Sequence, residues 1–260
     1  MDFTVAGARA LLRTLQGAGY SFVHFGDEIP ETHAVLLRHD VDLDLEDALT
    51  IARMEADLGI SAQFFVLTSS PLYNILSRRG QHIMREIVSL GHRVGVHIDP
   101  AAYADVTSIP QQALSLHLAE EAKLITSVTS AAVTAFSLHR PSDWDSQYPD
   151  DECGLASAYA QRYFNDIHYS SDSEGWWRYG AFVQSNEFAE RRSVQLLLHP
   201  EWWTGEPGEQ PGPRLDRLLR EQALRACSDV VATINPYGPY RDGTGGWPAA
   251  STTRPESAGH

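Results

Sequence analysis

The stretch V-L-L-R-H-D-V-D at residues 35–42 decides the fold, because an apolar run ends there in a cluster of ionisable residues. A buried parallel strand is a short, continuous apolar run, and the chemistry of α/β proteins lies just beyond the carboxyl ends of such strands. Side chains alternate with a period of two, so Asp40 and Asp42 project to the same face of an extended chain. Two carboxylates so placed repel each other unless a cation or a proton lies between them. The stretch therefore predicts a strand that delivers two acids to a site.

A plainer interpretation is a solvated helix start, because acidic residues stabilise a first helical turn and Asp44, Glu46 and Asp47 follow directly. Further apolar runs lie at residues 62–67, 92–97, 133–138 and 194–198. Amphipathic helical patterns lie at residues 4–16, 45–58, 81–90, 110–128 and 214–233. Alternating strands and helices indicate a parallel sheet, so the predicted fold class is α/β, an irregular (β/α) barrel in a single domain.

The composition is that of a folded, soluble protein. The 260 residues are 43% hydrophobic and 21% charged, which supplies ample apolar material for one core. We expect a barrel domain over residues 1–240 and a flexible tail over residues 241–260, where Gly, Pro, Ser and Thr dominate. The 34 acidic and 20 basic residues give a net charge of −14, which opposes binding to nucleic acid or anionic lipid.

The amino-terminal segment and the cysteines bear on compartment and chemistry. Residues 1–10 lack a basic segment followed by an apolar one, and no apolar run approaches the ~18 residues of a membrane span. We therefore expect a cytoplasmic protein without a membrane partner. Cys153 and Cys227 lack metal-type spacing, so the sequence predicts neither a disulfide framework nor a thiolate zinc site.

Strand after strand ends in an ionisable residue. Besides the two aspartates, these residues are His97, His139 with Arg140, and His199, and Asp172 ends a weaker segment, I-H-Y-S-S-D. One histidine in such a place is more often structural than a ligand, but the recurrence favours a site. Carboxylates with imidazoles and no thiolate are the ligand set of a catalytic zinc or similar divalent metal. Such a metal makes hydrolysis feasible near neutral pH.

Five motifs follow one another between residues 35 and 203: R-H-D-V-D, G-H-R-V-G-V-H, L-H-R-P, S-D-S-E-G-W-W and L-L-L-H-P. In content and order they resemble the motifs of the polysaccharide deacetylases of the NodB-homology type, also called carbohydrate esterase family four. Members of that family carry T-F-D-D-G, G-H-E-I-G-N-H, an R-P strand end, an Asp-Trp-type motif and a late Leu-to-His motif. The resemblance implies a (β/α) barrel of the deacetylase type, a divalent metal, with zinc expected, and a sugar-containing substrate.

The resemblance also implies a role for each matching residue. Asp40 would be the general base that activates water, and Arg140 would hold that carboxylate ionised and oriented. His97 would be the first metal histidine. His199 would give a proton to the leaving nitrogen, with Asp172 as its charge partner.

Two departures from the family pattern concern the metal. The family's second aspartate directly follows the first, but Val41 fills that place here, so we assign metal binding to Asp42. Which of Asp40 and Asp42 is base and which is ligand stays open. Ala101 stands where the family has its second metal histidine, and His139 is the expected replacement. Weaker candidates are Asp99 and His92, of which His92 lies at the opposite end of its strand and is expected to be structural.

Aromatic residues follow two of the proposed site residues. Trp177 comes after Asp172, and Trp202 and Trp203 come after His199. Their rings are candidates to stack on a sugar or an acyl group, and capping of the barrel mouth is an equal alternative.

The sequence thus predicts a metal-dependent hydrolase that removes an N-acyl group, with acetyl expected, from a sugar-like or glycosylated small molecule. A deformylase or cyclic amidase would use the same pocket. The missing second histidine suggests another alternative, a deacetylase-like protein that binds carbohydrate without turnover. Substrate, metal and oligomeric state are left open by the sequence.

Overall fold

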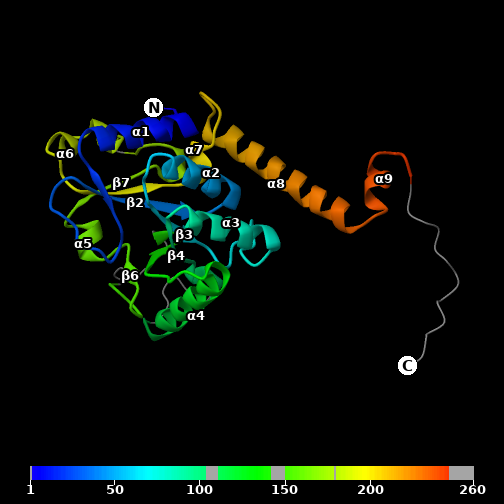
Figure 1. Cartoon of the computed structure of the whole chain (residues 1–260), viewed down its shortest axis with the longest axis horizontal. Coiled ribbons are helices and arrows are strands. Elements are labelled where there is room, and N and C mark those ends of the chain that lie inside the picture. The colour runs from blue at the N-terminus through cyan, green and yellow to red at the C-terminus, as the bar shows by residue number, and fades with distance from the viewer. Residues whose placement is uncertain (1, 104–110, 142–149, 179, 246–260) are drawn as a thin grey trace. The chain divides into compact units, whose positions relative to one another are not determined.

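The computed structural model describes residues 2–103, 111–141, 150–178 and 180–245. Their strands form one parallel sheet in the order β6-β5-β4-β3-β2-β8-β7, with β1 paired to β2 (Figure 1). The strands are β1 (Ser21–Val23), β2 (Ala34–Val41), β3 (Gln63–Val66), β4 (Arg93–Ile98), β5 (Ala135–Leu138), β6 (Ala156–Ser157), β7 (His168–Ser171) and β8 (Val194–Leu198). Among the described residues no ladder joins β6 to β7, so the barrel is open there. The predicted α/β class with an irregular barrel is confirmed.

Strand β2 is the centre of the sheet, and all of its residues are buried. It pairs with β3 from Arg38 onward and with β8 up to His39. Because neighbours cover both edges and both faces, its sequence is a continuous apolar run until the site begins. All ladders are parallel, so the carboxyl ends of the strands share one edge. We call this edge the carboxyl edge.

Helices connect the strands and cover the sheet. They are α1 (Val5–Gly17), α2 (Leu45–Ala56), α3 (Arg78–Ser89) and α4 (Gln111–Thr129), and α2 packs beside α3 (Figure 1). Asp44 caps α2 by accepting the backbone N–H of Glu46. The predicted acidic helix start is therefore present, but it begins at Asp44. The helix-start interpretation applies to Asp44 and the acids after it, and the site interpretation applies to Asp40 and Asp42.

Several short elements were not predicted. These are β6, α5 (Gln161–Phe164), α6 (Asn186–Ala189), α7 (Pro200–Trp203) and α9 (Tyr237–Arg241). Elements of two to five residues are shorter than the window that hydrophobic periodicity needs.

Close packing explains the glycine at position 95, inside β4, because a Cβ there would lie 2.6 Å from the Phe65 ring.

By internal packing the chain divides into two units, Met1–Arg214 and Leu215–His260. The first unit contains the whole sheet. The helix α8 (Pro211–Thr233) runs across the division, and α9 belongs to the second unit. The predicted boundary at residue 240 stays a prediction, and most of the predicted tail, residues 246–260, lies outside the described residues. Within the described residues, no helix combines the length and the apolar character needed to cross a membrane.

Candidate active site

Ionisable side chains at the ends of five strands meet at the carboxyl edge. The Nε2 atom of His97 lies 3.1 Å from Oδ1 of Asp42, and Nε2 of His199 lies 3.9 Å from the other oxygen of Asp42. The ring centroids of His97 and His139 are 5.3 Å apart. The Nδ1 atom of His199 lies 2.7 Å from Asp172. The structure thus brings together the residues that the strand ends predicted, although their catalytic roles stay predictions.

Arg38 forms a two-pronged ion pair with Asp40 inside the sheet. Its Nε donates to Oδ1 at 2.9 Å, and its terminal nitrogen donates to Oδ2 at 2.7 Å. Arg38 is fully buried and Asp40 is 3% exposed. Burial alone would raise the pKa of Asp40, but the charges of Arg38 and His97 outweigh burial and lower this pKa. Asp40 is therefore an ionised carboxylate of fixed orientation.

Four further groups surround this ion pair. Arg38 also donates to the Gln195 side chain and to the Tyr159 hydroxyl, each at 3.0 Å. Ser137 donates to Asp40 at 3.4 Å, and His97 lies 3.7 Å from the same carboxylate. Each carboxylate oxygen has two lone pairs, so Arg38 leaves one on each oxygen free to face the other site residues.

The orienting guanidinium comes from Arg38, whereas the family resemblance had suggested Arg140. Arg140 follows β5, is exposed, and has a positive φ of 50°. A residue on the same strand as Asp40 thus supplies a guanidinium to this carboxylate, and the role of Arg140 stays a prediction. The alternation that placed Asp40 and Asp42 on one face also places Arg38 on that face, so the signal for Arg38 was present in the sequence.

Asp42 and His97 form the part of the site that fits a metal. His97 Nδ1 is held by the Ser137 hydroxyl at 2.6 Å, which leaves Nε2 directed toward Asp42. Oδ1 of Asp42 is buried and has no hydrogen-bond partner in the described part of the chain. Bonds of about 2.0–2.2 Å to a tetrahedral zinc place two ligands roughly 3.3 Å apart, close to the 3.1 Å between these atoms. Burial opposes ionisation of Asp42, yet His97 and His199 lower its pKa below the usual range.

The described residues show no third metal ligand grouped with Asp42 and His97. Among the described residues, no three His, Cys, Asp or Glu side chains are grouped so as to hold a metal ion. His139, the predicted replacement ligand, has its Nδ1 atom 3.2 Å from Asp99, one of the two weaker candidates. The donor chemistry therefore fits a divalent metal through Asp42 and His97, and His139 as a third ligand stays a prediction.

His92 is structural, as expected from its place before β4. Its Nδ1 accepts the backbone N–H of Ala62 at 3.1 Å, and its Nε2 lies 2.9 Å from the carbonyl of Ala52. Both nitrogens are thus used in packing α2 against the sheet.

Asp172 and His199 form a buried dyad beyond β7 and β8. Asp172 is fully buried, and it also accepts the backbone N–H of His199 and the indole N–H of Trp203, the latter at 2.6 Å. Burial disfavours the imidazolium form of His199, but Asp172 and Asp42 outweigh burial and raise the pKa of His199 to about 10. His199 is therefore protonated at neutral pH and can act as an acid.

Glu201 is a neighbour of this dyad that sequence reasoning missed. It lies two residues after His199 and is 2% exposed. Burial and the negative charge of Asp42 raise the pKa of Glu201, while His199 lowers it. The surroundings of Glu201 thus disfavour its ionised form. Its signal in the sequence was weak, because an acid in a first helical turn is ordinarily a solvated residue.

The three tryptophans predicted to bind substrate differ in their surroundings. Trp203 is 1% exposed and donates to Asp172, so it supports the dyad from within the core, and its contact with substrate stays a prediction. Trp177 is half-buried, with its ring 6.1 Å from that of Trp203. Trp202 is also half-buried and packs against Gly175, where a Cβ would approach its ring to 3.2 Å. Sugar stacking by Trp177 and Trp202 stays a prediction.

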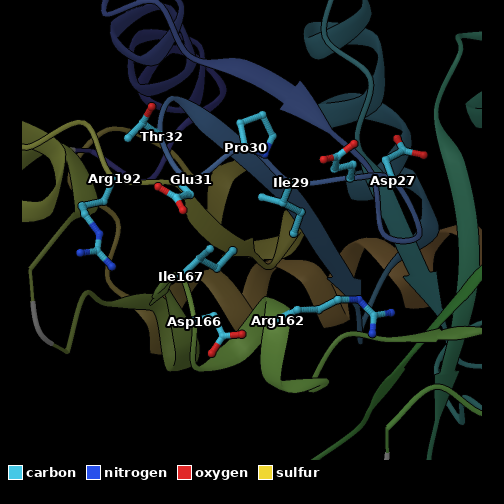
Figure 2. Close-up of a pocket in the computed structure, with 10 residues that line it drawn as sticks. Asp27, Ile29, Pro30, Glu31, Thr32, Arg162, Asp166, Ile167 and Arg192 are labelled. Carbon is cyan, nitrogen blue, oxygen red and sulfur yellow. The ribbon is translucent and has the colours of Figure 1, made fainter.

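Two cavities of small-molecule size lie in the first unit. One, of about 620 Å³, extends along β7 and includes Ser171 and Ser173, the neighbours of Asp172, together with Pro141. The other, of about 630 Å³, is shown in Figure 2. Its lining residues Thr32, Ile167 and Arg192 precede β2, β7 and β8, so this cavity lies at the opposite edge of the sheet.

Comparisons with known proteins give similarities among solved structures alone. No protein-family model matches the chain, and no curated protein matches it. Similar structures include a mutant, with restored activity, of a CE4 family pseudoenzyme from Bacillus anthracis, with 13% identity, a TM-score of 0.44, and coverage of 79% of this chain and 67% of that one.

Two further similar structures are named as enzymes. One is a family 4 carbohydrate esterase from Bacillus anthracis, with 16% identity, a TM-score of 0.41, and coverage of 81% and 85% of the two chains. The other is the catalytic domain of a peptidoglycan N-acetylglucosamine deacetylase from Eubacterium rectale, with 14% identity, a TM-score of 0.43, and coverage of 76% and 87%. We derive the function of this chain from its own site.

Proposed function

We propose that this protein is a metal-dependent hydrolase that removes an N-acyl group, with acetyl expected, from a sugar-containing small molecule. The observation that carries the proposal is the juxtaposition of an ionised carboxylate and a protonated imidazole around Asp42. Asp40, held by Arg38, supplies the base, and His199, held by Asp172, supplies the acid. Amide hydrolysis needs this pair, because water must lose a proton and the departing amine must gain one.

The chain's own residues have distinct tasks in this reaction. Arg38 keeps Asp40 ionised, so the free lone pair of Asp40 can accept a proton from water. His199 holds its proton on the side of Asp42 and delivers it to the leaving nitrogen. Ser137 orients His97, and Trp203 and the His199 backbone orient Asp172. A divalent metal, with zinc expected, would be held by Asp42, His97 and His139 and would polarise the acyl carbonyl and acidify water.

The test is amine release from a panel of N-acetylated sugars, sugar nucleotides and glycosylated metabolites, with and without a chelator. We expect turnover that chelation abolishes and that a divalent metal restores. Asp40→Asn and His97→Ala should each remove activity, and His97→Ala should also lower the metal content. Glu120→Gln, an exposed change on α4, is the control. Full activity and metal content in both site variants would refute the proposal.

A carbohydrate-binding protein without turnover is the second candidate. One observation favours it, namely that the described residues contain no cluster of three metal ligands. Metal analysis of the purified protein separates the candidates. A stoichiometric divalent ion supports the hydrolase, and a metal-free protein that binds sugars supports the binder.

A further inference from the structure

A second polar cluster lies on the β3 and β4 side of the site, and the reaction described above does not use it. Glu121, in α4, is 3% exposed, and its Oε1 accepts a hydrogen bond from the Tyr103 hydroxyl. The Thr68 side chain, just beyond β3, lies close enough to this carboxyl group to lower its pKa. His97 is close enough to interact electrostatically with Glu121, which places the cluster beside the reacting groups.

Two atoms of this cluster are buried without a hydrogen-bond partner in the described part of the chain. They are Oε2 of Glu121 and Nδ1 of His117. The two residues are four apart in α4, so their side chains lie on the same face of the helix. Buried polar atoms are ordinarily paired, and leaving one unpaired costs about 1–3 kcal/mol. A group that satisfies both atoms at once would therefore be bound favourably.

A hydroxyl group has the required chemistry. It can donate its proton to the carboxylate oxygen while its own oxygen accepts from the imidazole N–H. The same hydroxyl still fits if the protons are exchanged, with a neutral carboxyl group donating and the imidazole accepting. This matters because burial raises the pKa of Glu121, although Tyr103 and Thr68 oppose that rise.

The surroundings of the two atoms also suit a sugar. The Tyr103 ring stacks on His117 with centroids 3.8 Å apart, and Tyr103 is 36% exposed, so it can cover one side of an entering ring. The His117 side chain is 23% exposed, so part of its ring lies at the surface while its Nδ1 atom is buried. Glu120, its neighbour in sequence, is 62% exposed and lies 3.7 Å from His117, too far for a hydrogen bond.

We propose that Glu121 and His117 form a substrate subsite that binds one hydroxyl group of the sugar, with Tyr103 packed against it. The subsite proposal rests on the proposed function, which supplies the sugar-containing substrate. It names two specificity-determining residues outside the reacting groups. The subsite lies on the His97 side of the site, and the acid His199 lies on the other side of Asp42.

The test is a substrate–variant cycle measured by binding, so that it does not depend on turnover. Calorimetry gives the affinity of N-acetylglucosamine and of its 3-deoxy, 4-deoxy and 6-deoxy analogues for the wild-type protein, Glu121→Gln, His117→Phe and Glu120→Gln. We expect one deoxy analogue to bind the wild-type protein roughly 10-fold more weakly, as a hydrogen bond to a charged group predicts. Glu121→Gln and His117→Phe should lose a similar factor for the parent sugar and no longer distinguish that analogue.

Each outcome decides the proposal. If the wild-type protein binds all four sugars equally or binds none, or if Glu120→Gln loses as much affinity as Glu121→Gln, the subsite is refuted and an internal water is the partner of the two atoms. If only compounds bearing an ammonium group bind, the hydroxyl assignment is wrong. Amine release from the panel of N-acetylated compounds, which measures turnover and not binding, tests the reaction separately. Its absence alongside a positive binding cycle would refute the proposed function and leave the subsite standing.

Discussion

Two buried polar pairs lie back to back on adjacent residues of β2, an Arg–Asp ion pair and a hydrogen-bonded His–Glu pair. On the inner face, Arg38 pairs with Asp40, and on the outer face His39 lies 2.7 Å from Glu55 of α2. Both pairs are almost fully buried, but their connections differ. Asp40 also accepts a hydrogen bond from Ser137 and lies close to His97 at the carboxyl edge. In contrast, His39 Nδ1 and Glu55 Oε2 have no hydrogen-bond partner among the described residues. Burial of an ion pair therefore does not identify a site, and its connection to the carboxyl edge does.

The largest expected effect is a difference in kcat/KM between variants of the two pairs. Asp40→Asn should lower kcat/KM by about 10²–10⁴-fold, because it removes the proposed general base. Glu55→Gln should leave kcat/KM near that of the wild-type protein, although it lowers stability. Steady-state kinetics on any substrate found in the panel provides the measurement. Equal losses in the two variants would mean that the outer pair also serves the reaction.

The next effect concerns stability. Removing one member of the outer pair, as in Glu55→Leu, leaves His39 without its partner and should cost about 3–5 kcal/mol in the free energy of unfolding. Replacing both in His39→Leu/Glu55→Leu should recover most of that loss, because apolar side chains of similar volume need no hydrogen bonds. Urea denaturation of the singles and the double completes the cycle. Additive losses would show that the two residues do not interact.

The same contrast shows how far the sequence alone could go. The strand ends predicted Asp40, Asp42, His97, Asp172 and His199 at one edge, because parallel strands bring their carboxyl ends together. Arg38 was missed because an arginine is ordinarily a solvent-exposed residue. Its spacing of two residues from Asp40 nevertheless placed both side chains on one face of the strand. Glu121, His117 and Glu55 come from helices, where nothing in the sequence says which turn faces the site. Hydrophobic periodicity fixes a buried face but not the contacts of a polar residue within it.

A smaller effect concerns the pKa of His199, the proposed acid. The pKa of His199 is raised above that of the unfolded chain, so the stability it contributes is present below about pH 6.5 and is lost as the pH rises through about 10. Asp172→Asn should lower the pKa of His199 by roughly 2 units, since a charge-assisted hydrogen bond contributes about 1.5–3 kcal/mol. NMR titration of the imidazole in metal-free protein measures this pKa. An unchanged value would show that Asp42, and not Asp172, sustains the charge.

The smallest effect tests whether Trp203 serves the dyad or a ligand. Trp203→Phe removes the indole N–H that Asp172 accepts and keeps an aromatic ring, so it should cost about 1.5 kcal/mol in stability. Without that donor, the Asp172 carboxylate attracts a proton more strongly, and the pKa of His199 should rise slightly, opposite in sign to the effect of Asp172→Asn. Trp202→Phe, which lacks this contact, is the matched control and should leave the pKa of His199 unchanged. If Trp203→Phe instead weakens sugar binding while the pKa of His199 stays constant, Trp203 contacts the ligand, and its place among the residues that orient the acid is wrong.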